Sequence, residues 1–144
     1  LIRAFGSKMM FGFYKTTQNE PFLLIQVESF DNAYAGMLEW EKLMNADIGA
    51  LFTNRTLSIT EVIPPTGSST ATTTTQRTLN ADIANAGAFE DETIKNKDIR
   101  ILRTKQGDTI LLYSFIDKNT LIITSSTEVL STMVNKIADQ KLVR

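Results

Sequence analysis

The sequence predicts a single α+β domain over residues 1–144, with an antiparallel sheet and two amphipathic helices on one face. Residues 98–142 carry most of this prediction, because they contain three strand-length apolar runs, two turns and one helix without interruption. Residues 8–48 show the same order of strand, turn, strand and helix. Two such strand-turn-strand-helix halves on one sheet are typical of a ferredoxin-like or related fold.

The strands expected in the C-terminal half are runs of β-branched, aliphatic and aromatic residues at 98–105, 109–116 and 121–123. The turns between them contain Gly107, which adopts positive φ at little steric cost, and Asp117 and Asn119, whose short side chains bond their own backbone. The run 109–116 is apolar on both faces and is expected at the centre of the sheet. The run 98–105 carries basic residues, which are typical of an edge strand.

A helix is expected near the C-terminus, because Ser125 stands three residues before Glu128, which is the spacing of a capping box. Its apolar residues recur at helical spacing and form one stripe that must lie on the sheet. They are Leu130, Met133, Val134 and Ile137.

The N-terminal half predicts a hairpin, with Pro21 near the start of its second strand, and then a helix that Ser29 can cap. The apolar side of this helix is formed by Phe30, Ala33, Met37, Trp40, Met44 and Ile48. Glu41 falls within this apolar side. We expect its carboxylate either to reach solvent at the margin of the stripe or to meet a basic residue of the sheet.

The middle of the chain is expected to hold an internal insertion or long loop at 64–90. A strand over 56–63 is expected before it, because apolar and polar residues alternate there until two prolines stop the pattern. The tract TGSSTATTTTQRT at 66–78 has too few apolar residues to order itself, so we expect an extended surface loop, with pairing along a sheet edge or against a partner as the alternative. A short helix or irregular turn is expected at 80–89.

The composition removes several kinds of active site. The chain has no cysteine and no histidine, so disulfides, thiolate nucleophiles, histidine-dependent triads and the commonest transition-metal ligand are absent. Chemistry based on lysine or carboxylates stays open. The formal net charge of −1 gives no broad attraction to nucleic acid. We therefore expect a protein that is not an enzyme, holds no cofactor or metal and binds no nucleic acid.

Two charged clusters are the candidate binding groups. Residues 90–92 read Glu-Asp-Glu and can hold a hard cation such as calcium, stay solvated, or pair with the basic run that follows. That run can contact phosphate, lipid headgroups or an acidic protein partner, or it can protect an exposed strand from other chains. These candidate interaction residues are Lys95, Lys97, Arg100, Arg103 and Lys105.

Trp40 lies between Glu39 and Glu41, a composition that fits a sugar-stacking site with an acid pair. On a helix, however, the two glutamates point about 200° apart, so they cannot flank one glycosidic bond. We therefore expect Trp40 in the hydrophobic core.

Three short segments carry a resemblance to a known group of proteins. They read AGMLEWE at 35–41, IKNKDIR at 94–100 and YSFIDKNTLIIT at 113–124. With their surroundings at 20–52 and 89–130, they resemble uncharacterised extracytoplasmic domains of single-pass membrane-anchored proteins from small-genome bacteria. The resemblance implies a location in the periplasm or at the cell surface, and it implies no activity.

The chain opens at Leu1 without a signal segment or an apolar run of about 18 residues that can span a bilayer. We therefore expect a fragment whose membrane anchor lies outside it. The leading hypothesis is a non-catalytic interaction or assembly module of an envelope protein, acting on a protein partner or by self-assembly. An exposed apolar patch or open sheet edge favours it.

Two alternatives remain open at this stage. An extracytoplasmic ligand-binding or sensor domain would be favoured by a pocket of several hundred Å³ with converging polar groups. A carboxylate-dependent hydrolase would be favoured by two carboxyl groups that face each other across a cleft.

Overall fold

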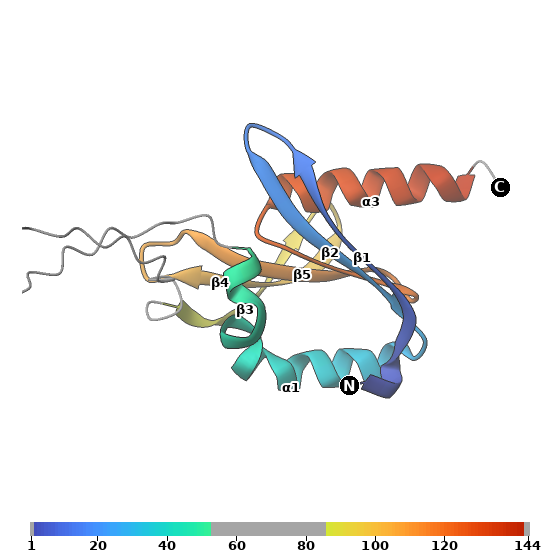
Figure 1. Cartoon of the computed structure of the whole chain (residues 1–144), viewed down its shortest axis with the longest axis horizontal. Coiled ribbons are helices and arrows are strands. Elements are labelled where there is room, and N and C mark those ends of the chain that lie inside the picture. The colour runs from blue at the N-terminus through green and yellow to red at the C-terminus, as the bar shows by residue number, and fades with distance from the viewer. Residues whose placement is uncertain (1, 53–85, 143–144) are drawn as a thin grey trace, which may run out of the picture.

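The computed structural model describes residues 2–52 and 86–142, and this part of the chain forms a six-stranded antiparallel sheet with two long helices (Figure 1). The elements in chain order are η1 Ile2–Ala4, β1 Phe5–Lys15, β2 Asn19–Val27, α1 Phe30–Ile48, η2 Gly49–Leu51, β3 Ala86–Ile94, β4 Lys97–Thr104, β5 Thr109–Asp117, β6 Thr120–Thr124 and α3 Thr127–Leu142. The predicted α+β class is confirmed. The ferredoxin-like arrangement is not confirmed, because the sheet has six strands.

The six described strands lie in the order β1-β2-β6-β5-β4-β3, so among the described residues β1 and β3 are the two edges of the sheet. β5 is interior, as its two apolar faces predict. β4 is also interior, and its expected edge position is wrong, because β3 pairs with it from Ala86↔Thr104 to Ile94↔Lys97. The segment 86–90, expected within the loop at 64–90, is therefore strand.

The turn between β3 and β4 explains why a strand forms there. Lys95 and Asn96 have φ values of 49° and 60°, the left-handed conformation that a two-residue hairpin turn of type I′ requires. Asparagine tolerates this conformation well. The helix or irregular turn expected at 80–89 is wrong for 86–89. The strand expected at 56–63, the tract at 66–78 and the rest of the loop lie outside the described residues.

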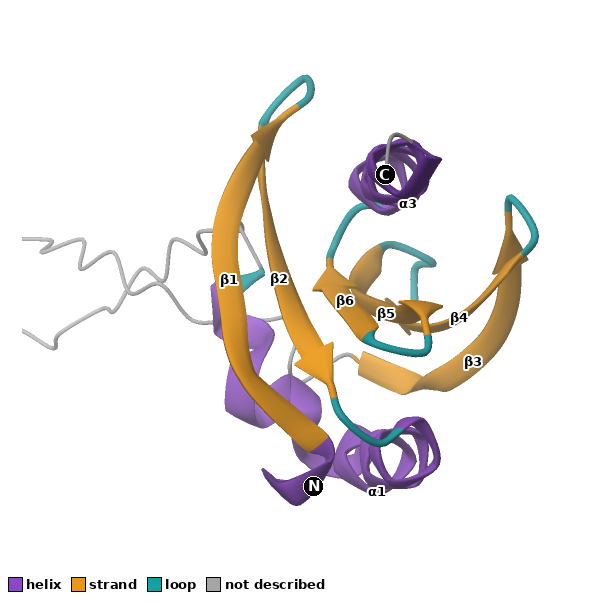
Figure 2. Cartoon of the chain, turned by 90° about the vertical axis from the view of Figure 1, so that its right-hand side faces the viewer, coloured by secondary structure: helices purple, strands orange, loops and turns teal. Residues whose placement is uncertain are grey.

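The two helices cover opposite faces of the sheet, which corrects the expectation that both lie on one face (Figure 2). On one face, α1 contributes the buried Ala33, Met37 and Met44, which cluster with Leu23, Ile25, Leu111, Tyr113, Leu121 and Ile123. On the other face, α3 contributes Val129, Leu130 and Met133, which cluster with Phe22, Ile99, Ile101, Leu112 and Ile122. These strand residues alternate along each strand, as the pleat requires. We call the two surfaces the α1 face and the α3 face.

The ends of β2 and β6 explain why the helices of the two halves cover opposite faces of the sheet. β2 ends at Val27 and β6 at Thr124, and each is followed by two residues before its helix begins. Val27 belongs to the α1 face, whereas Thr124 pairs with Phe22 and shares the α3 face. Because side chains alternate, one residue more or less in a strand moves the following helix to the other face. The halves are thus alike in element order and different in packing.

The local signals for turns were correct. Gly107 has a φ of 94°, and the Asp117 carboxylate accepts a hydrogen bond of 2.7 Å from the Asn119 amide. The α3 cap differs by one residue from the prediction, because Ser126 Oγ, and not the Ser125 side chain, accepts from the Val129 amide at 3.3 Å. Ser29 is the N-cap of α1, but its side chain makes no capping hydrogen bond.

Neither helix of the described chain has the length and hydropathy needed to cross a bilayer.

Candidate functional site

The edge strand β1 exposes an unusual amount of apolar surface. The exposed fractions are 67% for Met9, 52% for Met10, 46% for Phe11 and 64% for Phe13. Large apolar side chains gathered on one strand mark interaction surfaces, whereas isolated ones are ordinary. Among the described strands, no other carries an exposed large apolar residue.

Three of these residues point to the same side. Met9, Phe11 and Phe13 are opposite Ile25, Leu23 and Pro21 of β2, and paired residues of antiparallel strands share a face. Leu23 and Ile25 belong to the core under α1, so the three side chains lie on the α1 face. We call them the β1 stripe. The Phe11 ring contacts the rings of Phe13 and the buried Phe52, with centroid distances of 5.5 and 6.4 Å.

The backbone of the β1 stripe faces away from the sheet. Pro21 has no amide proton, and its carbonyl accepts a hydrogen bond of 2.8 Å from the Thr124 hydroxyl on the side of β6. The Phe13↔Pro21 pair is therefore a non-hydrogen-bonded pair of the antiparallel ladder. Such pairs alternate with hydrogen-bonded ones, so the N–H and C=O groups of Met9, Phe11 and Phe13 all point outward.

The opposite side of β1 is covered in part. Gly12 is opposite Phe22, and the Phe22 ring lies so close that an added Cβ would come within 3.0 Å of it. The ammonium group of Lys136 on α3 lies 4.9 Å from the centre of the Tyr14 ring, a cation–π contact. The only charged residues of β1 are Lys8 and Lys15, and the six residues between them lack the charges that usually protect an edge.

The other edge, β3, is acidic and engaged with its neighbour. Asp91 Oδ1 lies 2.9 Å from Arg100 Nη1, and Glu92 Oε2 lies 2.6 Å from Arg103 Nη2. Of the three expectations for residues 90–92, pairing with the basic run is therefore confirmed for two members. No acidic cluster suited to a metal ion occurs in the described ranges 2–52 and 86–142.

The five basic residues named from the sequence do not form one patch. Lys95 and Lys105 lie in the turns at opposite ends of β4. Lys97 lies beside Val134 and Ile137 of α3 and donates a 2.9 Å hydrogen bond to the Ile116 carbonyl, whereas Arg100 points to the α1 face. Arg103 is bound to Glu92 as described. Protection of an exposed strand is also wrong as their role, because β4 is interior.

Beneath α1, Glu41 is the centre of a charged network, as one of its two expected placements predicts. Arg100 Nε and Nη2 donate to Glu41 Oε1 and Oε2, both at 2.7 Å, and the Tyr113 hydroxyl donates to Oε1 at 2.7 Å. The side chain of Glu41 is only 13% exposed, and Tyr113 is 1% exposed. Fork-shaped pairing of this kind holds guanidinium and carboxylate in one geometry.

The network raises the pKa of two of its members. The hydrogen bond to Glu41 raises the pKa of Arg100 above its usual range, against the opposing effect of burial, and Asp91 adds to the rise. Burial raises the pKa of Tyr113 above its usual range, and the adjacent Glu41 carboxylate raises it further. Both groups therefore stay protonated throughout the physiological range, which suits a fixed structural link.

A cleft of about 520 Å³ opens between α1 and β3 beside this network. Its polar lining includes Glu41, Asn45 and Arg100, and its apolar lining includes Phe89 and Leu102. Asn45 Oδ1 is buried and has no hydrogen-bond partner in the described part of the chain. The Arg100 guanidinium is already bound by Glu41 and Asp91, so it is not available as a free anion site.

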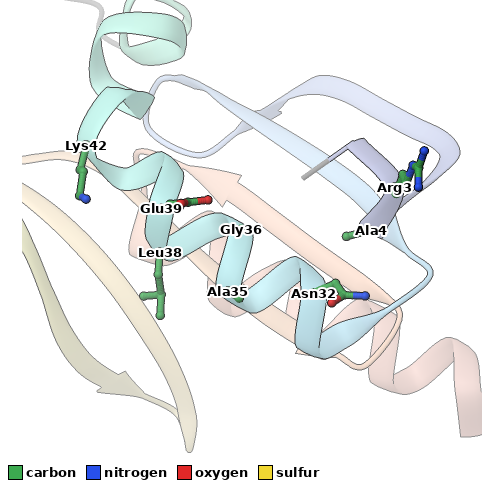
Figure 3. A pocket seen from close by; sticks show the side chains of 8 residues that line it. All are labelled: Arg3, Ala4, Asn32, Ala35, Gly36, Leu38, Glu39 and Lys42. Carbon is green, nitrogen blue, oxygen red and sulfur yellow. The ribbon is translucent and has the colours of Figure 1, made fainter.

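A second groove, of about 730 Å³, follows the outer side of α1 next to η1 (Figure 3). Its charged side chains, Arg3, Glu39 and Lys42, are exposed, and the close-up shows that they do not converge on one point. Trp40 is half-buried against the core and donates a 2.7 Å hydrogen bond to Asp47, which agrees with its expected core position. Glu39 and Glu41 point to different surroundings, as helix geometry predicts.

Comparisons with protein-family models, with curated proteins and with solved structures found no match to this chain. The candidate site therefore rests on geometry alone, and the β1 edge is its most distinct feature. The sequence shows 8–14 as a strand, but its place at the edge depends on the strand order, which local patterns do not contain. The one local signal is the run MMFGFY at 9–14, which lies between Lys8 and Lys15 and carries no charge.

Proposed function

We propose that the chain is a non-catalytic protein-interaction module that binds an extended segment of a protein partner along β1. The single observation that carries this proposal is the open edge of β1, where outward backbone groups and exposed apolar side chains belong to the same three residues, Met9, Phe11 and Phe13. In strand addition, main-chain hydrogen bonds supply affinity, and side-chain contacts on alternate residues supply selectivity.

The proposed setting is the extracytoplasmic part of a membrane-anchored envelope protein. This part of the proposal is supported by the resemblance of the segments at 35–41, 94–100 and 113–124. An assembly role is compatible with a small α+β unit that has one open edge and one charged edge. Similar layered units on other proteins serve many functions, so the fold by itself carries no part of the proposal.

Ligand binding or sensing remains the second candidate, because the cleft between α1 and β3 has a suitable size and is lined by both polar and apolar side chains, Asn45 among them. A hydrolase is not favoured by the arrangement of its carboxylates. Glu41 and Asp91 are both bound by Arg100, and this pairing favours a structural role for both.

The test is a selection of random extended peptides of about nine residues, which is a typical strand length, against the purified chain. Selected peptides are then measured by fluorescence anisotropy with three variants. Phe11→Lys and Met9→Pro are expected to weaken binding by about tenfold or more, because they place a charge on the edge or remove an outward amide. Leu43→Lys is the control for the added charge, because Leu43 is a 60% exposed apolar residue that lies on α1 and not on β1.

Two results would contradict the proposal. One is a selection that returns no peptide sensitive to either β1 variant. The other is a set of peptides that lose affinity equally with Leu43→Lys, which would indicate nonspecific apolar contact. Binding that instead depends on Asn45, tested with Asn45→Leu, would favour the ligand-binding candidate.

A further inference from the structure

We infer that the β1 edge pairs with the β1 edge of a second copy of this chain, antiparallel and centred on Phe11. This inference rests on the proposed function and deepens it by naming the partner strand. Two copies related by a two-fold axis at Phe11 would join their sheets into one continuous sheet. A symmetric dimer of this kind closes on itself and uses the same surface on both subunits.

The backbone supports this register. Outward-facing residues must pair with outward-facing residues, so Met9, Phe11 and Phe13 of one copy can only face residues of the same set or their odd-numbered neighbours. Centring on Phe11 places Phe11 opposite Phe11 and Met9 opposite Phe13 of the other copy. Each of these facing pairs exchanges two N–H···O=C hydrogen bonds in an antiparallel ladder.

The side chains favour the same register over its neighbours. A two-fold axis perpendicular to the sheet keeps both β1 stripes on the α1 face, so their exposed apolar side chains form one cluster. Moving the centre to Gly12 would place Met9 opposite the charged Lys15. Moving it to Met10 would place Phe13 opposite Ser7. Only the register centred on Phe11 matches every stripe residue with another stripe residue.

The distribution of charge agrees with this arrangement. In the register centred on Phe11, the facing residues 9–13 carry no charge, and Lys15 lies opposite the irregular part of β1 before Met9, not opposite Lys15 of the other copy. Like charges directly opposite each other would oppose pairing.

The β3 edge of a second copy is a poorer partner. It carries no exposed large apolar residue that could cover the β1 stripe, and its Asp91 and Glu92 are already paired with β4. A contact between β1 of one copy and β3 of the next would also repeat without closing and would form chains of indefinite length. The mass of the assembly therefore separates the two arrangements.

The first measurement is light scattering during size-exclusion chromatography of the whole chain over a dilution series. The wild type and Leu43→Lys are expected to form dimers that dissociate on dilution. Phe11→Lys alone and Phe11→Glu alone are expected to be monomers, because each places like charges opposite each other at the two-fold axis. An equimolar mixture of these two variants is expected to recover the dimer, since the introduced lysine of one copy would then face the introduced glutamate of the other.

The register centred on Phe11 is tested by a second pair of mixed variants, at Phe13 and Met9. Phe13→Lys mixed with Met9→Glu is expected to recover the dimer, whereas Phe13→Lys mixed with Phe13→Glu is expected to remain monomeric. Recovery in a mixture also shows that the single variants are folded. A circular dichroism melt of each variant provides the same control independently.

The inference is overturned by a wild type that is monomeric at every concentration, by assemblies larger than a dimer, or by a Phe11→Lys and Phe11→Glu mixture that stays monomeric. The peptide selection keeps the two proposals apart. If peptides bind along β1 while the chain stays monomeric, only self-pairing fails. If no peptide binds there and no dimer forms, strand addition at β1 fails as well.

Discussion

The two edges of this sheet are built in opposite ways. β3 carries Glu90, Asp91 and Glu92, and two of these are bound to arginines of the adjacent strand. β1 has lysines only at positions 8 and 15, and the residues between them expose large apolar side chains beside outward backbone groups. Soluble proteins commonly protect their edge strands with charge, and the centre of β1 lacks this protection, which is the feature that the proposed pairing along β1 requires.

The two sides of the sheet also differ in how they are held together. The β4–β3 side is tied to α1 by the network of Glu41, Arg100 and Tyr113. The β1–β2 side depends on its ladder and on apolar contacts such as Phe11 with Phe52. Charged contacts thus stabilise the β4–β3 side, which we call the closed side. Exposed apolar surface remains on the β1–β2 side, which we call the open side.

The sharpest way to test the assignment of the open edge is to place proline at adjacent methionines. Met10→Pro is expected to lower the free energy of unfolding by about 3 kcal/mol, because it removes an amide that bonds to β2 and leaves a carbonyl unpaired. Met9→Pro is expected to cost about 1 kcal/mol or less, because its amide faces outward. Urea unfolding followed by Trp40 fluorescence measures both values at concentrations where the variants are monomeric.

Equal costs for the two prolines would show that the backbone orientation derived from Pro21 is wrong. The comparison is well matched, since both positions hold methionine and both side chains are more than half exposed, at 67% and 52%. Differences in lost side-chain packing therefore contribute little to it.

The closed side is tested by Arg100→Met. This change leaves the Glu41 carboxylate beneath α1 without its cation, and we expect a loss of about 2 kcal/mol in the free energy of unfolding, somewhat less than for a fully buried pair. The double variant Arg100→Met with Glu41→Leu is expected to recover part of this loss, because no unpaired charge remains. A double variant that is less stable than the single one would contradict the electrostatic account.

Much of this fold follows from local sequence signals. Gly107, Asp117 and the apolar stripes of both helices predict the hairpins and the buried helix faces, because turn chemistry and helical periodicity act over a few residues. The edge position of β4 was wrong because 86–94, with its Ala-Gly-Ala and acidic segments, has little strand propensity of its own and forms a strand through its partner β4.

The candidate site was less accessible to sequence reasoning. Glu41 and Arg100 were each singled out, but they are 59 residues apart in the chain, and no local pattern pairs them. The face of the sheet that each helix covers depends on where the preceding strand ends. A shift of one residue in that end moves the helix to the other face, and the composition does not show it. The openness of β1 depends on strand order, which is a property of the whole sheet.

The network of Glu41, Arg100 and Tyr113 also predicts that the free energy of unfolding falls at alkaline pH. The pKa of Tyr113 is raised in the folded state, so below about pH 10 its phenol is protonated in both states and its contribution is fully present. Above that pH the unfolded chain loses the proton first, and stability falls by up to about 1.4 kcal/mol per pH unit. Tyr113→Phe is expected to show a shallower loss between pH 9 and 11 than the wild type.

Tyr34→Phe is the control for this pH experiment, because Tyr34 is 42% exposed and lies outside the Glu41 network. Urea unfolding at each pH supplies the measurement. Identical alkaline slopes for the wild type and Tyr113→Phe would show that the tyrosine does not titrate differently in the two states.

The smallest effect is expected for the exposed pair on β3. Glu92 and Arg103 are joined at 2.6 Å, but their side chains are 39% and 32% exposed, so water and salt screen the pair. Glu92→Gln is expected to change the free energy of unfolding by about 0.5 kcal/mol or less. A loss as large as that for Arg100→Met would mean that β3 is held to the sheet by its surface charges. A loss of about 0.5 kcal/mol or less would mean that β3 is held to the sheet by its ladder with β4 and not by its surface charges.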